Sequence, residues 1–180
     1  MTPTPSSYHV VLLVGFMGSG KSTVGSRLAA LLGWDFLDLD DLVEERTGLS
    51  VEAMFRERGE DAFRRVEAEV AEDALRGRNR VVAPGGGWAV RPGRLESVGP
   101  DVLTVWLEVE AETAVRRARL DGRARPLLDV PDPVGRAREL LERRRPSYRR
   151  ARLHLDAEHA TPERLARNIV QYLETVGETA

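Results

Sequence analysis

The sequence contains no cysteine, which excludes disulfide bonds and thiolate metal sites and suits a reducing compartment. It also contains no apolar run long enough to span a bilayer. The formal net charge of -2 at pH 7 gives no overall reason to expect a nucleic-acid or membrane partner. Residues 1–8 lack the basic segment and apolar stretch of a signal peptide. We therefore expect a cytoplasmic protein with a short disordered leader over residues 1–8 and a single domain over residues 9–177.

Lysine is almost missing as well, because the 27 lysine and arginine residues include a single lysine, Lys21. It lies in the segment GFMGSGKS, residues 15–22, which matches the phosphate-binding pattern G-x-x-x-x-G-K-[ST]. A slim, flexible lysine can reach along such a loop to the outer phosphates, whereas a planar guanidinium is bulkier and prefers a fork-shaped partner. No second lysine remains for the guanine-binding signature N-K-x-D, which disfavours a small GTPase.

This phosphate loop, residues 15–22, joins an apolar strand to a helix, as the motif requires. Glycines let successive backbone N–H groups face phosphate oxygens, and the N-terminus of the following helix favours the anion. A chance match in a glycine-rich turn is the alternative, which the strand–loop–helix setting disfavours. The motif predicts a nucleoside triphosphate and Mg²⁺, with Ser22 as a metal ligand, but it does not specify the reaction. The residues expected to hold the nucleotide phosphates are Gly18, Ser19, Gly20, Lys21, Ser22 and Thr23.

Short apolar runs alternate with amphipathic stretches along the whole chain, which predicts a mostly parallel sheet with helices on both faces. The expected strands cover residues 9–14, 34–40, the segment from residue 80 that opens into a glycine loop, 102–109 and 152–156. The expected helices cover residues 21–32, 42–47, 51–58, 60–77, 111–120, 133–145 and 162–176, with Gly33, Gly48 and Gly59 as stops.

Five further segments follow the phosphate loop in order: FLDLDDLVE, MFRERGEDAFRRVE, PGGGWAV, RARPLL and RRRPSYRR. In this order and spacing the chain resembles the shikimate kinases, from about residue 10 to residue 176. The resemblance implies an α/β P-loop kinase fold with a five-stranded parallel sheet and a mobile lid loop. It also implies transfer of the γ-phosphoryl group of ATP to the 3-hydroxyl of shikimate, in aromatic amino-acid biosynthesis. We expect Mg²⁺ as the cofactor and a monomeric enzyme.

The acidic segment DLDD follows the second expected strand, where open α/β sheets bind ligands. The resemblance assigns Asp40 to the hydroxyls of the substrate, as the acceptor of the proton from the attacking oxygen. It assigns Asp38 to the magnesium shell, through water. The alternative is a plain acidic helix N-terminus, because acids are favoured there. We adopt that alternative for Asp41.

A shikimate site needs guanidinium groups for the carboxylate of the ring. The resemblance assigns Arg64 and Arg144 to this role, although an arginine on a helix is more often a solvated surface charge. Arg143 and Arg145 flank Arg144 and leave that assignment uncertain by one position. The resemblance also places the backbone of the triplet Gly85, Gly86 and Gly87 along the substrate, where side chains would fill the space of the ring. A tight turn is the alternative interpretation of these glycines.

Residues 121–133 correspond to the lid of the family, and Arg125 matches the lid arginine that reaches the ATP phosphates. An ordinary exposed loop with incidental arginines is the alternative. Arg117 is a weaker candidate for packing on adenine. The sequence departs from the family near Ala160, where a basic residue is common, so contact with adenine would depend on backbone and on Pro162.

Two rival functions remain open at this point. Another small-metabolite kinase of the same fold, such as a gluconate kinase, also binds a hydroxy-acid, but the combination of DLD, FRR and GGG favours shikimate. A non-catalytic module that binds nucleotides or nucleic acid through the arginines of residues 143–150 is the second rival. The near-neutral net charge and the paired acids oppose it, so we expect no nucleic-acid partner and no membrane partner.

Overall fold

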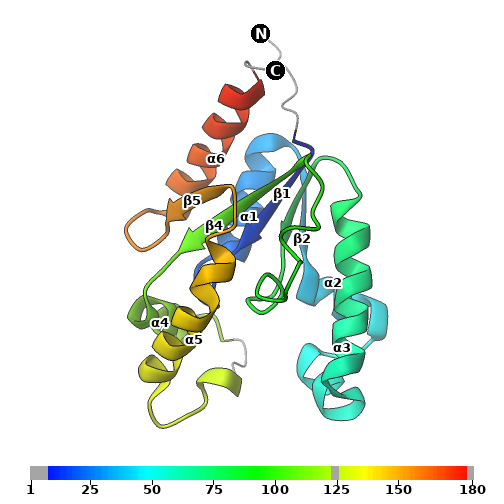
Figure 1. The fold of residues 1–180 in the computed structure, drawn as a ribbon, viewed down its shortest axis with the longest axis vertical. Helices are drawn as coiled ribbons and strands as arrows, with labels where there is room; N and C mark the ends of the chain where they lie inside the picture. Colours follow the sequence, from blue (N-terminus) through cyan, green and yellow to red (C-terminus); the bar gives the residue numbers. More distant parts are fainter. Residues whose placement is uncertain (1–7, 123–125, 178–180) are drawn as a thin grey trace.

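The computed structural model describes residues 8–122 and 126–177. Its centre is a five-stranded parallel sheet in the order β2-β3-β1-β4-β5, with helices on both faces (Figure 1). The alternation of apolar runs and helical patterns therefore predicts the fold class correctly. The strands are β1 (Val10–Val14), β2 (Asp35–Asp38), β3 (Arg80–Ala83), β4 (Val102–Glu108) and β5 (Leu153–Asp156).

The described residues form six α-helices and one short 3₁₀ helix, which lie between the strands except for the last helix, which follows β5. They are α1 (Lys21–Leu32), α2 (Leu39–Thr47), α3 (Val51–Leu75), α4 (Ala111–Leu120), η1 (Pro126–Leu128), α5 (Pro133–Tyr148) and α6 (Pro162–Gly177). No helix among the described residues is long and apolar enough to cross a bilayer.

The central strand β1 explains why the core has two halves. All five of its residues are buried, and successive side chains of a strand point to opposite faces. Val10, Leu12 and Val14 join a cluster with residues of α2, α3, α4 and α5. Val11 and Leu13 join a second cluster with residues of α1 and α6. Because helices cover both faces of the sheet, we expect the polar ligand site at the carboxyl ends of the strands, where open α/β sheets bind ligands.

The second strand is shorter than the sequence predicts. Extended structure was expected over residues 34–40, but β2 ends at Asp38 and α2 begins at Leu39. The cause is the capping geometry of Asp38, whose side chain accepts a hydrogen bond from the backbone N–H of Asp40 at 3.1 Å. Asp40 therefore lies in the first turn of a helix and not on a strand.

Two other boundaries depend on glycine and proline. Gly59 has φ 81° and ψ 170°, so α3 is kinked there, which agrees with the expected stop between residues 58 and 60. Helix α5 continues three residues beyond its expected end at Arg145, through Pro146 to Tyr148. The preference of a pre-proline residue against helical geometry is thus overridden in this last turn.

At the amino terminus, residues 1–7 of the expected leader lie outside the described residues. Tyr8 does not fit that expectation, because its side chain is buried in the cluster against α1 and α6. Its hydroxyl accepts a hydrogen bond from Nη1 of Arg152 at 3.1 Å.

Candidate functional site

A cavity of about 390 Å³ lies at the carboxyl ends of β1, β2 and β3. One part of its wall is the phosphate loop and the start of α1, and the opposite part consists of Asp38, Asp40 and residues 83–86. At its far end the cavity is lined by Arg117 and by residues that flank the start of α6. Those flanking residues are Ala157, Ala160, Pro162 and Leu165. One continuous space is therefore lined by the phosphate loop, by Gly85 and Gly86 of the triplet and by the start of α6, whereas Gly87, Arg64 and Arg144 are not among its lining residues.

The phosphate loop packs tightly against α4. Gly18 has φ 75°, and a Cβ atom there would lie 2.2 Å from the carbonyl oxygen of Ala114. Only glycine fits that position. The side chain of Lys21 folds back over the loop, where Nζ donates to the carbonyl oxygens of Gly15 at 2.9 Å and Phe16 at 3.1 Å. The lysine thus lies along the loop, as its slim shape allows.

Asp38 connects the phosphate loop to the second strand. Its Oδ2 accepts a hydrogen bond from the Ser22 hydroxyl at 2.8 Å, while Oδ1 caps α2. These are the oxygen donors that Mg²⁺ takes when nucleotide phosphates and water complete its shell. The described residues contain no group of three or more His, Cys, Asp or Glu side chains that could hold a metal ion. The oxygen atoms of Ser22 and Asp38 fit a magnesium ion that arrives with a nucleotide.

Arg64 lies on α3 in a fixed, partly buried position. Its Nη1 donates to Glu67 at 2.9 Å, and Nε and Nη2 both donate to Glu60 at 3.2 Å. Its guanidinium also lies 5.1 Å from the ring centre of Phe63 and 5.8 Å from that of Phe55. Burial lowers the pKa of Arg64, but the hydrogen bonds and charges of the two glutamates outweigh burial, so the pKa lies above its usual value. Arg64 is a permanent cation with a set orientation.

The glycine triplet brings three predicted residues together. A Cβ atom at Gly85 would lie 3.3 Å from Oδ1 of Asp40. At Gly86 it would lie 3.6 Å from Nη1 of Arg144, and at Gly87 it would lie 3.6 Å from Nη2 of Arg64. One carboxylate and two guanidinium groups from α2, α3 and α5 thus converge on three consecutive residues that carry no side chain.

The structure distinguishes the three neighbouring arginines of α5. Arg144 lies next to Gly86, with its guanidinium 5.6 Å from the ring centre of Phe16. Arg143 is exposed and pairs with Glu139 at 2.5 Å, and Arg145 pairs with Glu142 at 3.5 Å.

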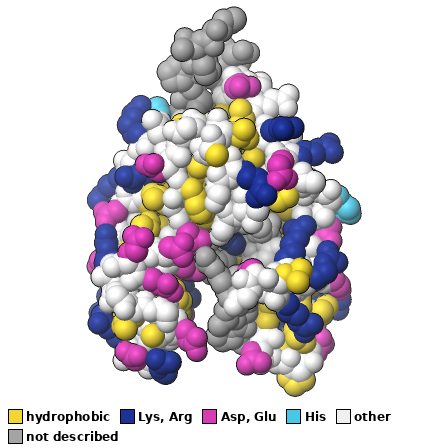
Figure 2. All heavy atoms as spheres, turned by 180° about the vertical axis from the view of Figure 1, so that it is seen from behind, with side chains coloured by type: hydrophobic (Ala, Val, Ile, Leu, Met, Phe, Trp, Pro, Cys, Tyr) yellow, Lys and Arg dark blue, Asp and Glu magenta, His cyan; other side chains and the backbone are white. Residues whose placement is uncertain are grey.

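The basic segment 143–150 does not form a surface of one charge. Arg143 and Arg145 pair with glutamates, and Arg150 pairs with Glu96. Figure 2 shows positive and negative side chains interspersed over the face that it presents. Among the described residues, these arginines of the segment thus carry acidic partners of opposite charge.

On the nucleotide side, the predicted residues are only partly within the described part of the chain. Arg117 and Ala160 line the cavity, together with Pro162. Arg125, the predicted lid arginine, lies outside the described residues. Within the predicted lid, residues 126–128 form η1.

Sequence reasoning missed Glu158, whose side chain connects the loop before α6 to α4 by hydrogen bonds. Its Oε2 accepts a hydrogen bond from the backbone N–H of Glu110 at 3.0 Å, and Oε1 accepts from the Thr113 hydroxyl at 2.5 Å. Burial alone would raise the pKa of Glu158, but these hydrogen bonds and the charge of Arg117 lower it overall. A charged carboxylate at the N-terminus of α4 is stabilised there by the helix dipole.

A family model, sequence relatives and solved structures of known proteins all match this chain to shikimate kinases. The model of the family described as "Shikimate kinase" matches residues 17–174. The chain is 43% identical to the shikimate kinase of Moorella thermoacetica over 163 residues, which cover 91% of this chain and 93% of the relative. The shikimate kinase of Acinetobacter baumannii, solved in complex with shikimate, superposes with a TM-score of 0.86 at 34% identity and covers 94% of this chain and 95% of its own.

A gluconokinase from Sinorhizobium meliloti is a more distant neighbour. Its structure superposes with a TM-score of 0.61 at 18% identity and covers 98% of this chain and 96% of its own. At this identity the likeness extends to the fold alone.

Proposed function

The chain belongs to the shikimate kinase family, and we propose that it transfers the γ-phosphoryl group of ATP to the 3-hydroxyl of shikimate. One observation carries this proposal: Asp40, Arg64 and Arg144 converge on the glycine triplet, of which Gly85 and Gly86 line the phosphate-loop cavity together with Asp40. Two cations and one carboxylate suit a small ring that bears one carboxylate and several hydroxyls. Gluconate kinase activity is the alternative, and only the similarity of the fold supports it.

In this reaction the residues of the chain mostly position the two substrates and neutralise negative charge, because phosphoryl transfer requires little covalent chemistry from the protein. Arg64 and Arg144 hold the substrate carboxylate, so that the 3-hydroxyl faces Asp40. Asp40 accepts the hydroxyl proton as the oxygen forms its bond to the γ-phosphorus. The bond from that phosphorus to the bridging oxygen breaks, and ADP leaves. Lys21 neutralises charge on the outer phosphates.

Ser22 and Asp38 would hold Mg²⁺, which supplies charge neutralisation between the phosphates when it is bound. We expect Arg117 and Pro162 to contact adenine and Arg125 to reach the phosphates from the lid. We also propose that the enzyme acts as a cytoplasmic monomer with one domain over residues 9–177. Sedimentation of the pure protein tests the monomer directly.

The proposed activity is tested by measuring ADP release from ATP and Mg²⁺ with shikimate, with gluconate and without an acceptor. We expect shikimate to raise ADP release strongly and gluconate to leave it at the level without an acceptor. Release that does not depend on shikimate, or preference for gluconate, would contradict the proposal.

Arg64 offers a test of carboxylate binding. The variant Arg64→Lys keeps a positive charge beside the buried Glu67 but loses the fork that binds a carboxylate in two places. We expect the KM for shikimate to rise about 10- to 100-fold with a smaller change in kcat, because the lost contact is made before and during the reaction. Steady-state kinetics with shikimate as the varied substrate measure this effect.

Arg65 supplies the matched control, since it is the exposed neighbour on the same helix. Arg65→Lys should leave the KM for shikimate unchanged. Equal effects of the two substitutions, or no effect of Arg64→Lys, would show that Arg64 does not bind the carboxylate.

Glu158 offers a test on the nucleotide side. Glu158→Ala removes two hydrogen bonds between the loop at residues 157–162 and α4. We expect the KM for ATP to rise a few-fold, about 3- to 10-fold, while the KM for shikimate stays constant, because only the nucleotide end of the cavity loosens. The exposed Glu174 on α6 is the control, and Glu174→Ala should change neither constant. A rise in the KM for shikimate alone would contradict this role.

A further inference from the structure

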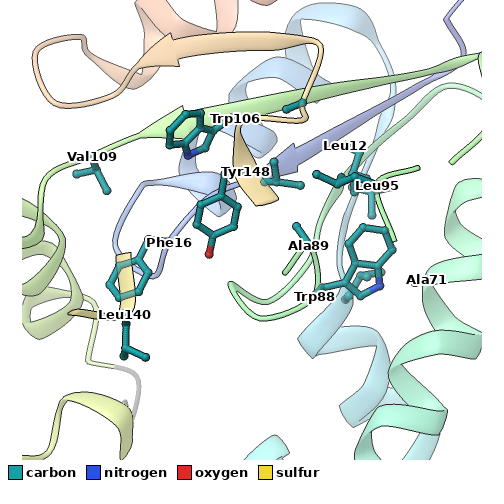
Figure 3. Packing of buried hydrophobic residues seen from close by; sticks show 14 of the residues in the cluster. Leu12, Phe16, Ala71, Trp88, Ala89, Leu95, Trp106, Val109, Leu140 and Tyr148 are labelled. Carbon is teal, nitrogen blue, oxygen red and sulfur yellow. The ribbon is translucent and has the colours of Figure 1, made fainter. Parts of the chain in front are cut away.

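Tyr148, the last residue of α5, carries a buried hydroxyl that the reaction described above does not use. Its side chain is 0% exposed, and its ring centre lies 6.0 Å from that of Trp106. Figure 3 shows the hydroxyl pointing away from Trp106. Its Oη donates a hydrogen bond of 2.6 Å to the carbonyl oxygen of Gly86, across 62 residues of sequence. The middle of the glycine triplet is thus attached to the end of α5.

Gly86 is the point at which three parts of the site meet. A Cβ atom there would lie 3.3 Å from the backbone nitrogen of Met17 and 3.4 Å from the carbonyl oxygen of Gly15, both in the phosphate loop. It would lie 3.6 Å from Nη1 of Arg144. A shift of the Gly86 peptide would therefore change the distance between the triplet, the phosphate loop and the substrate arginine together.

Arg144 and Tyr148 are four residues apart in α5, so their side chains are neighbours on one face of the helix. Both lie next to Gly86. Burial raises the pKa of Tyr148 to about 12, although the charge and hydrogen bonding of Arg144 oppose that rise. The phenol is therefore protonated throughout the physiological range and always able to donate to Gly86. Its oxygen remains available to accept from the guanidinium of Arg144.

We propose that Tyr148 is a positioning residue for the acceptor: its hydroxyl fixes Arg144 and the Gly85–Gly87 backbone at one spacing, and thereby sets the affinity for the substrate carboxylate and ring. The proposal rests on the proposed function in naming shikimate as the acceptor. It extends that function to a side chain that touches neither substrate. The phosphate-loop atoms next to Gly86 belong to Gly15 and Met17 and not to Gly18–Thr23, the residues expected to hold the nucleotide phosphates. We therefore expect a larger effect on acceptor binding than on nucleotide binding.

The test is Tyr148→Phe, which removes one oxygen and keeps the ring that packs on Trp106. We expect the KM for shikimate to rise about 5- to 20-fold, with the KM for ATP within twofold of its original value, because the carbonyl that loses its donor belongs to the glycine triplet beside Arg144. A purely structural role predicts a different result. It would lower thermal stability and the amount of active enzyme, and so the apparent kcat, but it would leave the KM for shikimate of the folded enzyme unchanged.

Tyr8→Phe is the matched control, because Tyr8 is also a buried tyrosine, and its hydroxyl accepts a hydrogen bond from Arg152. It packs in the opposite half of the core, with α1 and α6. This substitution should leave both KM values unchanged. An equal rise in the KM for shikimate in the two variants, or an unchanged KM in Tyr148→Phe, overturns the proposal.

A second measurement does not depend on the reaction. The backbone N–H of Trp88 donates to the carbonyl oxygen of Gly85 at 3.0 Å and reports on the opening of the triplet. Hydrogen exchange of the free protein should show this amide exchanging about tenfold faster in Tyr148→Phe than in the original protein, because local opening no longer breaks the Tyr148 hydrogen bond. In Tyr8→Phe it should exchange at the original rate. Unchanged exchange in Tyr148→Phe refutes the anchoring. If the protein shows no shikimate-dependent turnover, the proposed function and the effect of Tyr148 on acceptor affinity are both refuted. Faster exchange in Tyr148→Phe would then support only the hydrogen bond that anchors Gly86.

Discussion

Replacement of Lys21 by methionine is expected to lower kcat about a thousandfold or more, because we propose that Lys21, the only lysine of the chain, neutralises the outer phosphates. Methionine has nearly the same length and flexibility, so the substitution removes charge and leaves volume. The hydrogen bonds from Nζ to Gly15 and Phe16 are lost as well. They lie at the partly open surface of the loop, where water can replace them. We therefore expect near-original thermal stability alongside the loss of turnover.

The variant Lys21→Arg tests whether the positive charge of Lys21 is sufficient or whether its slim shape is needed as well. If positive charge alone were needed, arginine would restore most of the activity. The phosphate loop is narrow, however, and Lys21 lies along it within hydrogen-bond distance of two carbonyl oxygens. A planar guanidinium does not fit this path, so we expect Lys21→Arg to remain severely impaired. Single-turnover measurements with both variants distinguish the two cases, and full activity in Lys21→Arg would show that the geometry of the lysine is not required.

Asp40→Asn should have an effect of similar size, a loss of about a thousandfold in kcat, because asparagine cannot accept the proton of the attacking hydroxyl. The side chain lies in the first turn of α2 and lines the cavity next to Gly85. Asparagine has nearly the same shape, so substrate binding should change much less than turnover. Kinetics with shikimate as the varied substrate should show a large fall in kcat and a modest change in KM.

Asp41 provides the matched control for Asp40. It is the next residue of the same helical turn, it is exposed, and it carries the same charge at the same helix N-terminus. If Asp40 served only to complement the helix dipole, the two asparagine variants would behave alike. We expect Asp41→Asn to retain activity within about twofold, since it removes the dipole contribution without touching the cavity. Equal losses in both variants would contradict a role of Asp40 in proton transfer.

The sequence predicts the fold well because the three inner strands β3, β1 and β4 are mostly apolar runs and amphipathic helical segments separate most of the strands. The burial of all five residues of β1 follows directly from such a run. The segment DLDD misleads for a local reason: its alternation continues the strand pattern, while its acids also suit a helix N-terminus. The capping hydrogen bond from Asp40 N–H to Asp38 decides between them, and it is visible only in three dimensions.

The surroundings of the predicted acceptor residues are likewise hard to predict from the sequence. The phosphate loop is contiguous in sequence, so its pattern can be found directly. The partners of the acceptor residues are scattered, and contacts across long sequence separations leave little signal. Glu67 beside Arg64 has the spacing of a helix ion pair, a signal that was available. Tyr148 and Gly86 are far apart along the chain, and nothing in either segment indicates their hydrogen bond.

A crystal structure with a non-hydrolysable ATP analogue, Mg²⁺ and shikimate tests most directly whether nucleotide and acceptor share one crevice. We predict that the shikimate carboxylate lies between the guanidinium groups of Arg64 and Arg144, along the Gly85–Gly87 backbone. Its 3-hydroxyl should lie within hydrogen-bond distance of Asp40 and face the terminal phosphate held by Lys21. Shikimate bound away from these three side chains, or with its carboxylate toward the phosphate loop, would contradict this arrangement.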